Sequence, residues 1–215
     1  MAGDRWLVAG LGNPGPSYAG NRHNAGYLAA DVLAARAGVR FRAGKFRAVA
    51  AEGRVAGLGA IIVKPLTFMN DSGVAVSGIS GYYRLDPEHV VVVHDELDLP
   101  FGTVRLKRGG GDNGHNGLRS VTAHLGTREY YRVRIGIGRP PARMDPAAYV
   151  LRDFSTAERK ELPFLLDRAA DAVEALLTHG LVAAQNAFHS AGTSGTCLDA
   201  RCFGAHRCRH NDGAA

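Results

Sequence analysis

The 215-residue sequence predicts an α/β fold, namely a single three-layer domain with a mixed, mostly parallel sheet and helices on both faces. Short apolar segments of strand length alternate along the chain with longer segments whose apolar residues recur at helical spacing. Such alternation favours parallel pairing, because each connecting helix covers a face of the sheet. The length suits one full hydrophobic core. We therefore expect one domain over residues 1–189 and a disordered tail over residues 190–215, where glycine, alanine and serine are frequent.

The first half of the chain predicts a strand, a loop and a helix, followed by further strands. Residues 6–11 are apolar and predict a buried strand, whereas residues 25–37 carry apolar residues at helical spacing. Short apolar runs then predict strands, and the segment between the last two favours a helix despite its glycines. The expected strands cover residues 49–51, 59–63 and 90–94, and the expected helix covers residues 72–83.

The second half predicts two amphipathic strands and three helices. Two segments alternate polar and apolar residues, which predicts strands with one exposed face. Ser155 and Glu158 have the spacing of a capping box, and the apolar stripe after them predicts a long helix that ends at Gly180. The expected elements are strands over 103–107 and 132–137, a helix after residue 116, and helices over 155–180 and 181–188.

The net charge of +6 is concentrated in one segment. Residues 101–145 hold nine basic and three acidic residues, and this difference of six equals the whole excess. A basic segment in an otherwise balanced chain indicates a phosphate-rich partner, although a solvated basic face would have the same composition. The sequence contains no run of about 18 apolar residues and no apolar signal segment, so we expect a cytoplasmic protein without membrane contact.

All three cysteines lie in the tail, so the expected domain depends on no disulfide. Cys197, Cys202 and Cys208 lie there together with His206 and His210. These side chains could bind zinc, but the close Cys-x2-Cys spacing of common structural sites is missing. We favour a disordered terminus over a zinc site.

His23 is the first candidate catalytic residue. It lies in a glycine-rich loop between the first strand and the first helix, surrounded by Asn13, Asn21, Arg22 and Asn24. An imidazole can take up and return a proton near neutral pH, and a simple turn would not need so many polar neighbours. A helix cap or a surface histidine is the alternative interpretation.

Asp95 is the expected partner of His23. It follows a fully apolar strand, and in open α/β sheets ligands bind at the carboxyl ends of the strands. In a mainly parallel sheet the loop of His23 opens on the same edge, where a carboxylate could fix the imidazole tautomer. A metal site formed by His94, Asp95, Glu96 and Asp98 is the competing hypothesis. It is less favoured, because adjacent residues of an extended chain point to opposite faces.

Three further segments have both a structural and a functional interpretation. Asn70 or Asp71 is suited to capping the following helix, and an amide there could equally stabilise an oxyanion. The glycine loop over 109–117, near Arg105, Lys107 and Arg119, is either an anion receptor or a mobile connection. Residues 10–15 match the dinucleotide-binding pattern G-x-G-x-x-G, but several polar residues separate them from the helix, which argues against a nicotinamide or flavin enzyme.

Six motifs in order resemble those of the bacterial peptidyl-tRNA hydrolase family. The resemblance covers about residues 6–188, and the motifs are specific as a set. They read Gly10-Leu-Gly-Asn-Pro-Gly15, Tyr18-x3-Arg22-His-Asn-x-Gly26, Lys64-Pro-x-Thr-Phe-Met-Asn70-x-Ser-Gly73, His94-Asp-Glu-Leu-Asp-Leu-Pro100, Gly109-Gly-Gly-x-x-Gly-His-Asn-Gly-Leu118 and Arg134-Ile-Gly-Ile-Gly138.

The resemblance implies cleavage of the ester that joins a peptide to the terminal ribose of tRNA, which recycles tRNA after abortive translation. It implies no metal or organic cofactor and a monomer. His23 matches the catalytic base and Asp95 the residue that orients it, while Lys107 and Arg134 match the contacts with the 5′-phosphate. The substrate-binding positions implied by the match are Asn13, Tyr18, Phe68, Asn70, His115 and Asn116.

Two further points qualify the resemblance. The family usually has threonine at the position of Asn21, and small residues or histidine at those of Asp112 and Asn113. Asp112 adds a negative charge beside the expected phosphate loop, which would weaken RNA affinity unless the side chain points away. Some plant relatives act as RNA-splicing cofactors, so a non-hydrolytic RNA-binding protein of the same fold is the alternative function.

Overall fold

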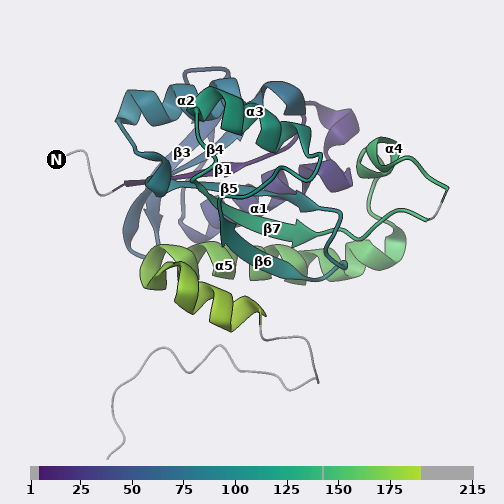
Figure 1. The fold of residues 1–215 in the computed structure, drawn as a ribbon. Helices are drawn as coiled ribbons and strands as arrows, with labels where there is room; N and C mark the ends of the chain where they lie inside the picture. Colours follow the sequence, from purple (N-terminus) through teal and green to yellow (C-terminus); the bar gives the residue numbers. More distant parts are fainter. Residues whose placement is uncertain (1–4, 142, 190–215) are drawn as a thin grey trace, which may run out of the picture.

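The computed structural model describes residues 5–141 and 143–189, and its centre is a seven-stranded sheet with the order β2-β3-β4-β1-β5-β7-β6 (Figure 1). The strands are β1 Arg5–Gly10, β2 Arg42–Ala43, β3 Ala48–Val55, β4 Leu58–Pro65, β5 Val90–Glu96, β6 Val104–Arg108 and β7 Tyr131–Gly136. The α-helices are α1 Ala25–Arg36, α2 Ser72–Tyr83, α3 Asn116–Leu125, α4 Pro146–Val150 and α5 Thr156–His189. The short 3-10 helices are η1 Pro16–Tyr18, η2 Arg22–Asn24, η3 Met69–Asp71 and η4 Pro87–His89.

The sheet is mixed, with a parallel centre and antiparallel edges. Strand β1 pairs in parallel with β4 and β5, and β5 pairs in parallel with β7. Antiparallel pairing joins β3 to both β2 and β4 on one side and β6 to β7 on the other. The four central strands therefore end at the same edge of the sheet, and the loops that follow them come together there.

Helices cover both faces of this sheet and complete the predicted three layers. Helices α2 and α3 lie on one face, and α1 and α5 lie on the other (Figure 1). In the central strand β5, Val91 and Val93 pack into the core beside α1 and α5, whereas Val90 and Val92 pack into the core beside α2 and α3. A strand with both faces buried reads as an uninterrupted apolar run, which is why β5 was predictable.

The capping box at the start of α5 is confirmed. The N–H of Ser155 donates to a carboxylate oxygen of Glu158 at 2.6 Å, and the N–H of Glu158 donates to the Ser155 hydroxyl at 3.2 Å. The predicted helix end at Gly180 appears as a break inside α5, because Gly180 has φ 77° and ψ 174°. A positive φ of this kind favours glycine. The long and the short predicted helices are the two parts of α5.

The prediction of an exposed face on residues 132–137 is wrong. Strand β7 lies inside the sheet, and Arg132 on that face is completely buried. Its guanidinium donates to the carbonyl oxygens of Gly110 and Gly111 at 2.9 and 2.6 Å, so the glycine loop covers this part of the sheet. The prediction holds better for β6, whose polar residues are partly exposed at the sheet edge.

Two short elements, β2 and α4, had no periodic signal in the sequence, because two and five residues are too few to show a period.

Among the described helices, none combines the length and apolar character needed to cross a membrane. The tail predicted to be disordered, with its cysteines and candidate zinc ligands, lies outside the described residues.

Candidate functional site

A cavity of about 520 Å³ lies where the central strands end. The loop after β1 forms one wall of the cavity, and the end of β5 forms its floor. The segments before α2 and α3 form two further walls. Helix α4 closes the remaining side with apolar residues. Eight residues with predicted site roles line this cavity, namely Asn13, Tyr18, His23, Phe68, Asn70, Asp95, His115 and Asn116.

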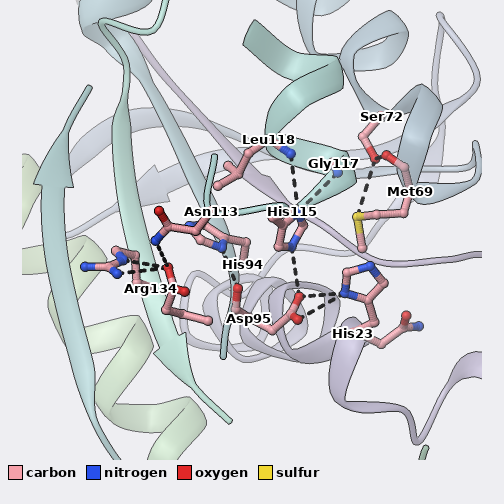
Figure 2. A network of polar contacts seen from close by, with 12 residues as sticks. His23, Met69, Ser72, His94, Asp95, Asn113, His115, Gly117, Leu118 and Arg134 are labelled. Atoms are coloured by element: carbon pink, nitrogen blue, oxygen red, sulfur yellow. Dashed lines mark hydrogen bonds and ion pairs between the residues drawn. The ribbon is translucent and has the colours of Figure 1, made fainter. Parts of the chain in front are cut away.

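The predicted contact between His23 and Asp95 is confirmed. The Nδ1 atom of His23 lies 2.9 and 3.0 Å from the two carboxylate oxygens of Asp95 (Figure 2). Since an ionised carboxylate only accepts hydrogen bonds, Nδ1 carries the proton and Nε2 keeps its lone pair. Figure 2 shows the other ring nitrogen directed away from Asp95. His23 therefore presents a proton acceptor to the cavity.

His23 is held in place by its neighbour in η2. The Arg22 side chain is buried, and it donates to the carboxylate of Glu158 at 2.5 Å and to the carbonyl oxygen of Asp153 at 2.7 Å. Its guanidinium also lies 4.4 Å from the Tyr149 ring. Sequence reasoning noted Arg22 only as a polar neighbour, because its partners lie more than 120 positions away.

Asp95 accepts hydrogen bonds from two histidines. In addition to His23, the Nε2 atom of His115 lies 3.0 Å from Asp95 Oδ1. Burial alone would raise the pKa of the Asp95 carboxyl, but the charges and hydrogen bonds of His23 and His115 outweigh it. The pKa of Asp95 is therefore held far below its usual range, and the carboxylate stays ionised at every pH of interest.

The same contact raises the pKa of His23. Burial disfavours the imidazolium and lowers the pKa, but the negative charge and hydrogen bond of Asp95 have the larger combined effect. The pKa of His23 consequently lies above the ordinary value of 6.5. His23 is thus a stronger base than a free imidazole, and it is in its neutral, accepting form above that raised pKa.

His115 has a structural task that the sequence did not reveal. It is the N-cap of α3, and its Nδ1 accepts from the N–H groups of Gly117 and Leu118 at 3.1 and 3.3 Å. With Nδ1 accepting, the proton lies on Nε2 and is donated to Asp95. His115 therefore occupies two of the N–H groups at this helix start, which argues against a phosphate at that point of the glycine loop.

The four residues of the competing metal hypothesis do not converge. His94 is buried and its Nδ1 contacts the carbonyl oxygen of the next residue at 2.6 Å, while Glu96 pairs with Arg134 at 2.9 Å. Asp98 forms an ion pair with Arg139 near the surface. Burial and the nearby His115 lower the pKa of His94 well below 6.5, so this ring is neutral.

A different trio, His23, Asp95 and His115, has potential ligand atoms within 4.8 Å of one another. These atoms are already joined by hydrogen bonds, since both imidazole N–H groups donate to the carboxylate. A metal ion would have to replace both bonds. The hydrogen bonding is that of a carboxylate that orients a base, as in catalytic triads.

Asn13 is fixed by hydrogen bonds at the wall of the cavity. Its Oδ1 accepts from the N–H of Met69 at 2.8 Å, and its main-chain N–H and carbonyl oxygen both bind the Asn24 side chain, at 2.9 and 3.0 Å. This arrangement leaves the amide N–H groups of Asn13 available for a ligand, since no described residue accepts from them. A fixed donor of this kind can bind a carbonyl or an oxyanion.

Asn70 and Asn116 also line the cavity, near the aromatic side chains of Tyr18 and Phe68. The two rings meet edge to face with their centres 6.3 Å apart, and Phe68 is more than half exposed. The expected capping role of Asn70 or Asp71 is wrong, since neither makes a side-chain cap bond at η3 or α2. The Asn70 side chain is thus not occupied in capping.

The predicted phosphate contacts lie beside the cavity, on β6 and β7. Arg134 binds Glu96 through Nε and Nη2, which leaves Nη1 without a partner among the described residues. Lys107 forms no ion pair within the described residues, and burial together with Arg134 and Arg132 lowers its pKa. An anion placed between these cations would relieve their mutual repulsion.

The three departures from the family pattern are accommodated locally. Asn21 donates to Asp153 at 2.7 Å, and Asn113 donates to Glu96 at 3.4 Å. Asp112 accepts from a main-chain N–H of its own loop at 3.0 Å. The other carboxylate oxygen of Asp112 lies 3.8 Å from Arg119 Nε, so an ion pair partly offsets the negative charge beside the predicted phosphate contacts.

Comparison with known proteins gives consistent similarities. Residues 7–195 match the sequence profile of the family described as peptidyl-tRNA hydrolase. The peptidyl-tRNA hydrolase of Frankia alni is 64% identical over 86% of this chain and 94% of that protein. That of Streptomyces coelicolor is 57% identical over 88% and 97%. The crystal structure of peptidyl-tRNA hydrolase from Acinetobacter baumannii is 36% identical, has a TM-score of 0.81, and is matched over 86% of this chain and 94% of that chain.

Proposed function

This chain belongs to the peptidyl-tRNA hydrolase family and is a hydrolase of peptidyl-tRNA, and we propose that His23 and Asp95 carry out the hydrolysis. The bond cleaved is the ester between the carboxyl end of a peptide, or of an N-blocked amino acid, and the 3′-terminal ribose of tRNA. The observation that supports these roles is the His23–Asp95 contact, which leaves His23 Nε2 open to the cavity.

In the first step, His23 Nε2 removes a proton from a water molecule while the water oxygen attacks the ester carbonyl carbon. The imidazolium that forms is stabilised by the Asp95 carboxylate, which stays ionised. General-base catalysis of this kind contributes about 10²- to 10⁴-fold in rate. The step produces a tetrahedral intermediate with one negatively charged oxygen.

Amide donors at the cavity wall stabilise that oxygen. Asn13 is held by its own Oδ1 contact to Met69, so its N–H groups are fixed before the substrate arrives. Asn70 and Asn116 also line the cavity, and their amides position the peptide and the ribose. The intermediate then expels the ribose oxygen, which takes the proton back from His23, and free tRNA and a peptide carboxylic acid result. The acid loses its proton to water at neutral pH.

Lys107 and Arg134 bind the 5′-phosphate of the tRNA, beside the end that carries the ester. Lys107 provides an ammonium that forms no ion pair within residues 5–141 and 143–189, and Arg134 provides the N–H groups that Glu96 leaves free. Phosphate contacts position the nucleic acid and make its binding sensitive to salt. All these groups come from one chain, so we propose a monomer that acts on tRNA in the cytoplasm.

The decisive experiment is the release of N-acetyl-aminoacyl groups from tRNA by the purified protein in excess EDTA. We expect rapid release by the wild-type protein and loss of nearly all turnover in His23→Ala, with tRNA binding retained. His89→Ala, a histidine on η4 outside the cavity, is the matched control and keeps full activity. Tight tRNA binding without release by the wild-type protein would favour the RNA-binding alternative, and loss of release with EDTA would indicate a metal-dependent reaction.

A further inference from the structure

Exposed apolar side chains are concentrated on one side of the cavity. Among the described residues, eight large apolar side chains are exposed, and five of them lie on α2 or in the loops next to it. Exposed apolar side chains that gather in one region mark binding sites more often than single exposed residues do. The five residues, here called the apolar strip, are Phe46, Leu66, Phe68, Val74 and Tyr82.

The apolar strip begins at the rim of the catalytic cavity and leads away from it. Phe68 lines the cavity, and Leu66 lies two positions earlier in the same loop. The N–H of Leu66 donates to the carbonyl oxygen of Arg47 at 2.7 Å, which joins this loop to the one that carries Phe46. The Phe46 ring in turn lies 6.2 Å from that of Tyr82. A main-chain hydrogen bond and a ring contact thus connect the loop at the ester site with the far end of α2.

The strip ends in a second cavity of about 940 Å³, formed by β2, β3 and the end of α2. Arg40, Arg42 and Lys45 line it, together with one carboxylate, Glu52. Neither arginine forms an ion pair with a described residue, and the Lys45 ammonium lies 4.1 Å above the Tyr82 ring. This basic groove therefore offers aromatic faces and an excess of positive charge, which suits acidic and aromatic groups.

The order of the strands places the groove opposite to the predicted phosphate contacts. Those contacts lie on β6 and β7, at one end of the sheet, whereas β2 and β3 form the other end. A tRNA that binds on the β6 side directs the peptide at its 3′ end toward β4 and β3. The distance from β1 to β2 is three strand spacings, about 14 Å, which an extended peptide covers in about four to five residues.

We propose that the apolar strip and the basic groove bind the peptide part of the substrate: the strip leads the chain away from the ester, and the groove binds about the fourth to the eighth residue counted from the ester, with a preference for acidic and aromatic side chains. The proposal rests on the proposed function, because the ester must lie at His23 for the peptide to follow this path. A substrate that carries a single blocked amino acid ends before the groove and does not use it.

Three tRNA substrates test the proposal. One carries an N-acetylated amino acid, and two carry octapeptides whose fifth to eighth residues from the ester alternate aspartate with phenylalanine or lysine with serine. We expect the wild-type kcat/KM to be about tenfold higher for the first octapeptide than for the second. Lys45→Glu and Phe46→Ala each reduce this ratio severalfold and leave the short substrate unchanged. Lys160→Glu, the same charge change on α5, leaves the ratio at its wild-type value.

Equal kcat/KM for both octapeptides in the wild-type protein would overturn the proposal, as would an equal loss on all three substrates in Lys45→Glu. Weaker binding of deacylated tRNA to Lys45→Glu would assign the groove to RNA and also overturn it. Failure of the wild-type protein to cleave the short substrate would refute the proposed function. In that case the affinity of the free octapeptides, measured by fluorescence anisotropy, decides on the groove: preference for the acidic peptide supports it, and equal affinity overturns it.

Discussion

Replacement of Asp95 by asparagine removes the charge that makes His23 a strong base. Both His23 Nδ1 and His115 Nε2 donate to the carboxylate, at distances of 2.9–3.0 Å. Both imidazoles contact the same oxygen, Oδ1, and His23 Nδ1 also lies 3.0 Å from Oδ2. An asparagine places an NH2 donor at one of these two positions, where it faces the N–H of His23, so His23 must move away or invert its tautomer. An inverted His23 carries its proton on Nε2 and cannot accept one from water. We expect kcat to fall about 10²- to 10⁴-fold, which corresponds to about 2.7–5.5 kcal/mol.

The pH profile of Asp95→Asn separates this effect from a loss of structure. In the wild-type protein the Asp95 charge raises the pKa of His23 above 6.5, so the acid limb of kcat/KM lies above pH 6.5. Without that charge only burial acts, and the pKa of His23 falls below 6.5. The acid limb of the residual activity should therefore move to lower pH. Asp98→Asn, which removes a surface carboxylate at the end of the same strand, should leave the rate and the profile unchanged.

The assay is the release of an N-acetyl-aminoacyl group from tRNA between pH 5 and 9, with folding checked by circular dichroism. A folded Asp95→Asn protein whose acid limb stays above pH 6.5 would refute the reasoning, because another group would then set the pKa. Unchanged kcat in that variant would refute the role of Asp95 altogether.

Three further changes test other parts of the structure. Lys107→Ala should weaken tRNA binding in filter-binding titrations and reduce the slope of log affinity against log salt by about 1, because one phosphate contact is lost; an unchanged slope would remove Lys107 from the interface. Gly26→Ala should lower the melting temperature strongly, because the added Cβ would lie 2.3 Å from the carbonyl oxygen of Val93 and push α1 off the sheet. Gly81→Ala, where no atom lies within 4 Å of the added Cβ, should raise the stability by about 0.5–1 kcal/mol in urea titrations; a lower stability would show that α2 depends on flexibility there.

The parts of the site that follow from strand direction were predictable from the sequence. The strand before Asp95 is an apolar run, and the loop of His23 follows another, so a parallel sheet brings both residues to one edge. The capping box of Ser155 and Glu158 was predictable because its signal lies within four residues. In these cases local patterns, together with the rule that parallel strands end at the same edge of a sheet, are sufficient to place the residues.

The remaining features depend on contacts between distant segments. Period-two alternation is the same in an edge strand and in an interior strand, so the burial of Arg132 could not be foreseen before the glycine loop was placed over it. The bond of Arg22 to Glu158 spans 136 positions. His115 reaches Asp95 only because α3 packs beside β5, and no local pattern marks that contact. The sequence shows that these residues are polar, but it does not show which residues they contact.

The pairing of His23 with Asp95 couples the stability of the fold to catalysis in opposite directions. The pKa of His23 is raised in the folded protein, so its charged interaction contributes fully below the unfolded pKa of about 6.5 and is lost as the pH rises through the folded value. The depressed pKa of Asp95 contributes stability above its unfolded value near 3.8, and this part is lost only as the pH falls through the folded value. Proton abstraction needs neutral His23, and hence a pH above the raised pKa. As the pH rises through the raised pKa of His23, activity therefore appears over the same pH interval in which the imidazolium–carboxylate attraction stops stabilising the fold. The hydrogen bonds from neutral His23 and His115 to Asp95 remain in that interval, and they keep the base oriented when its charge is gone.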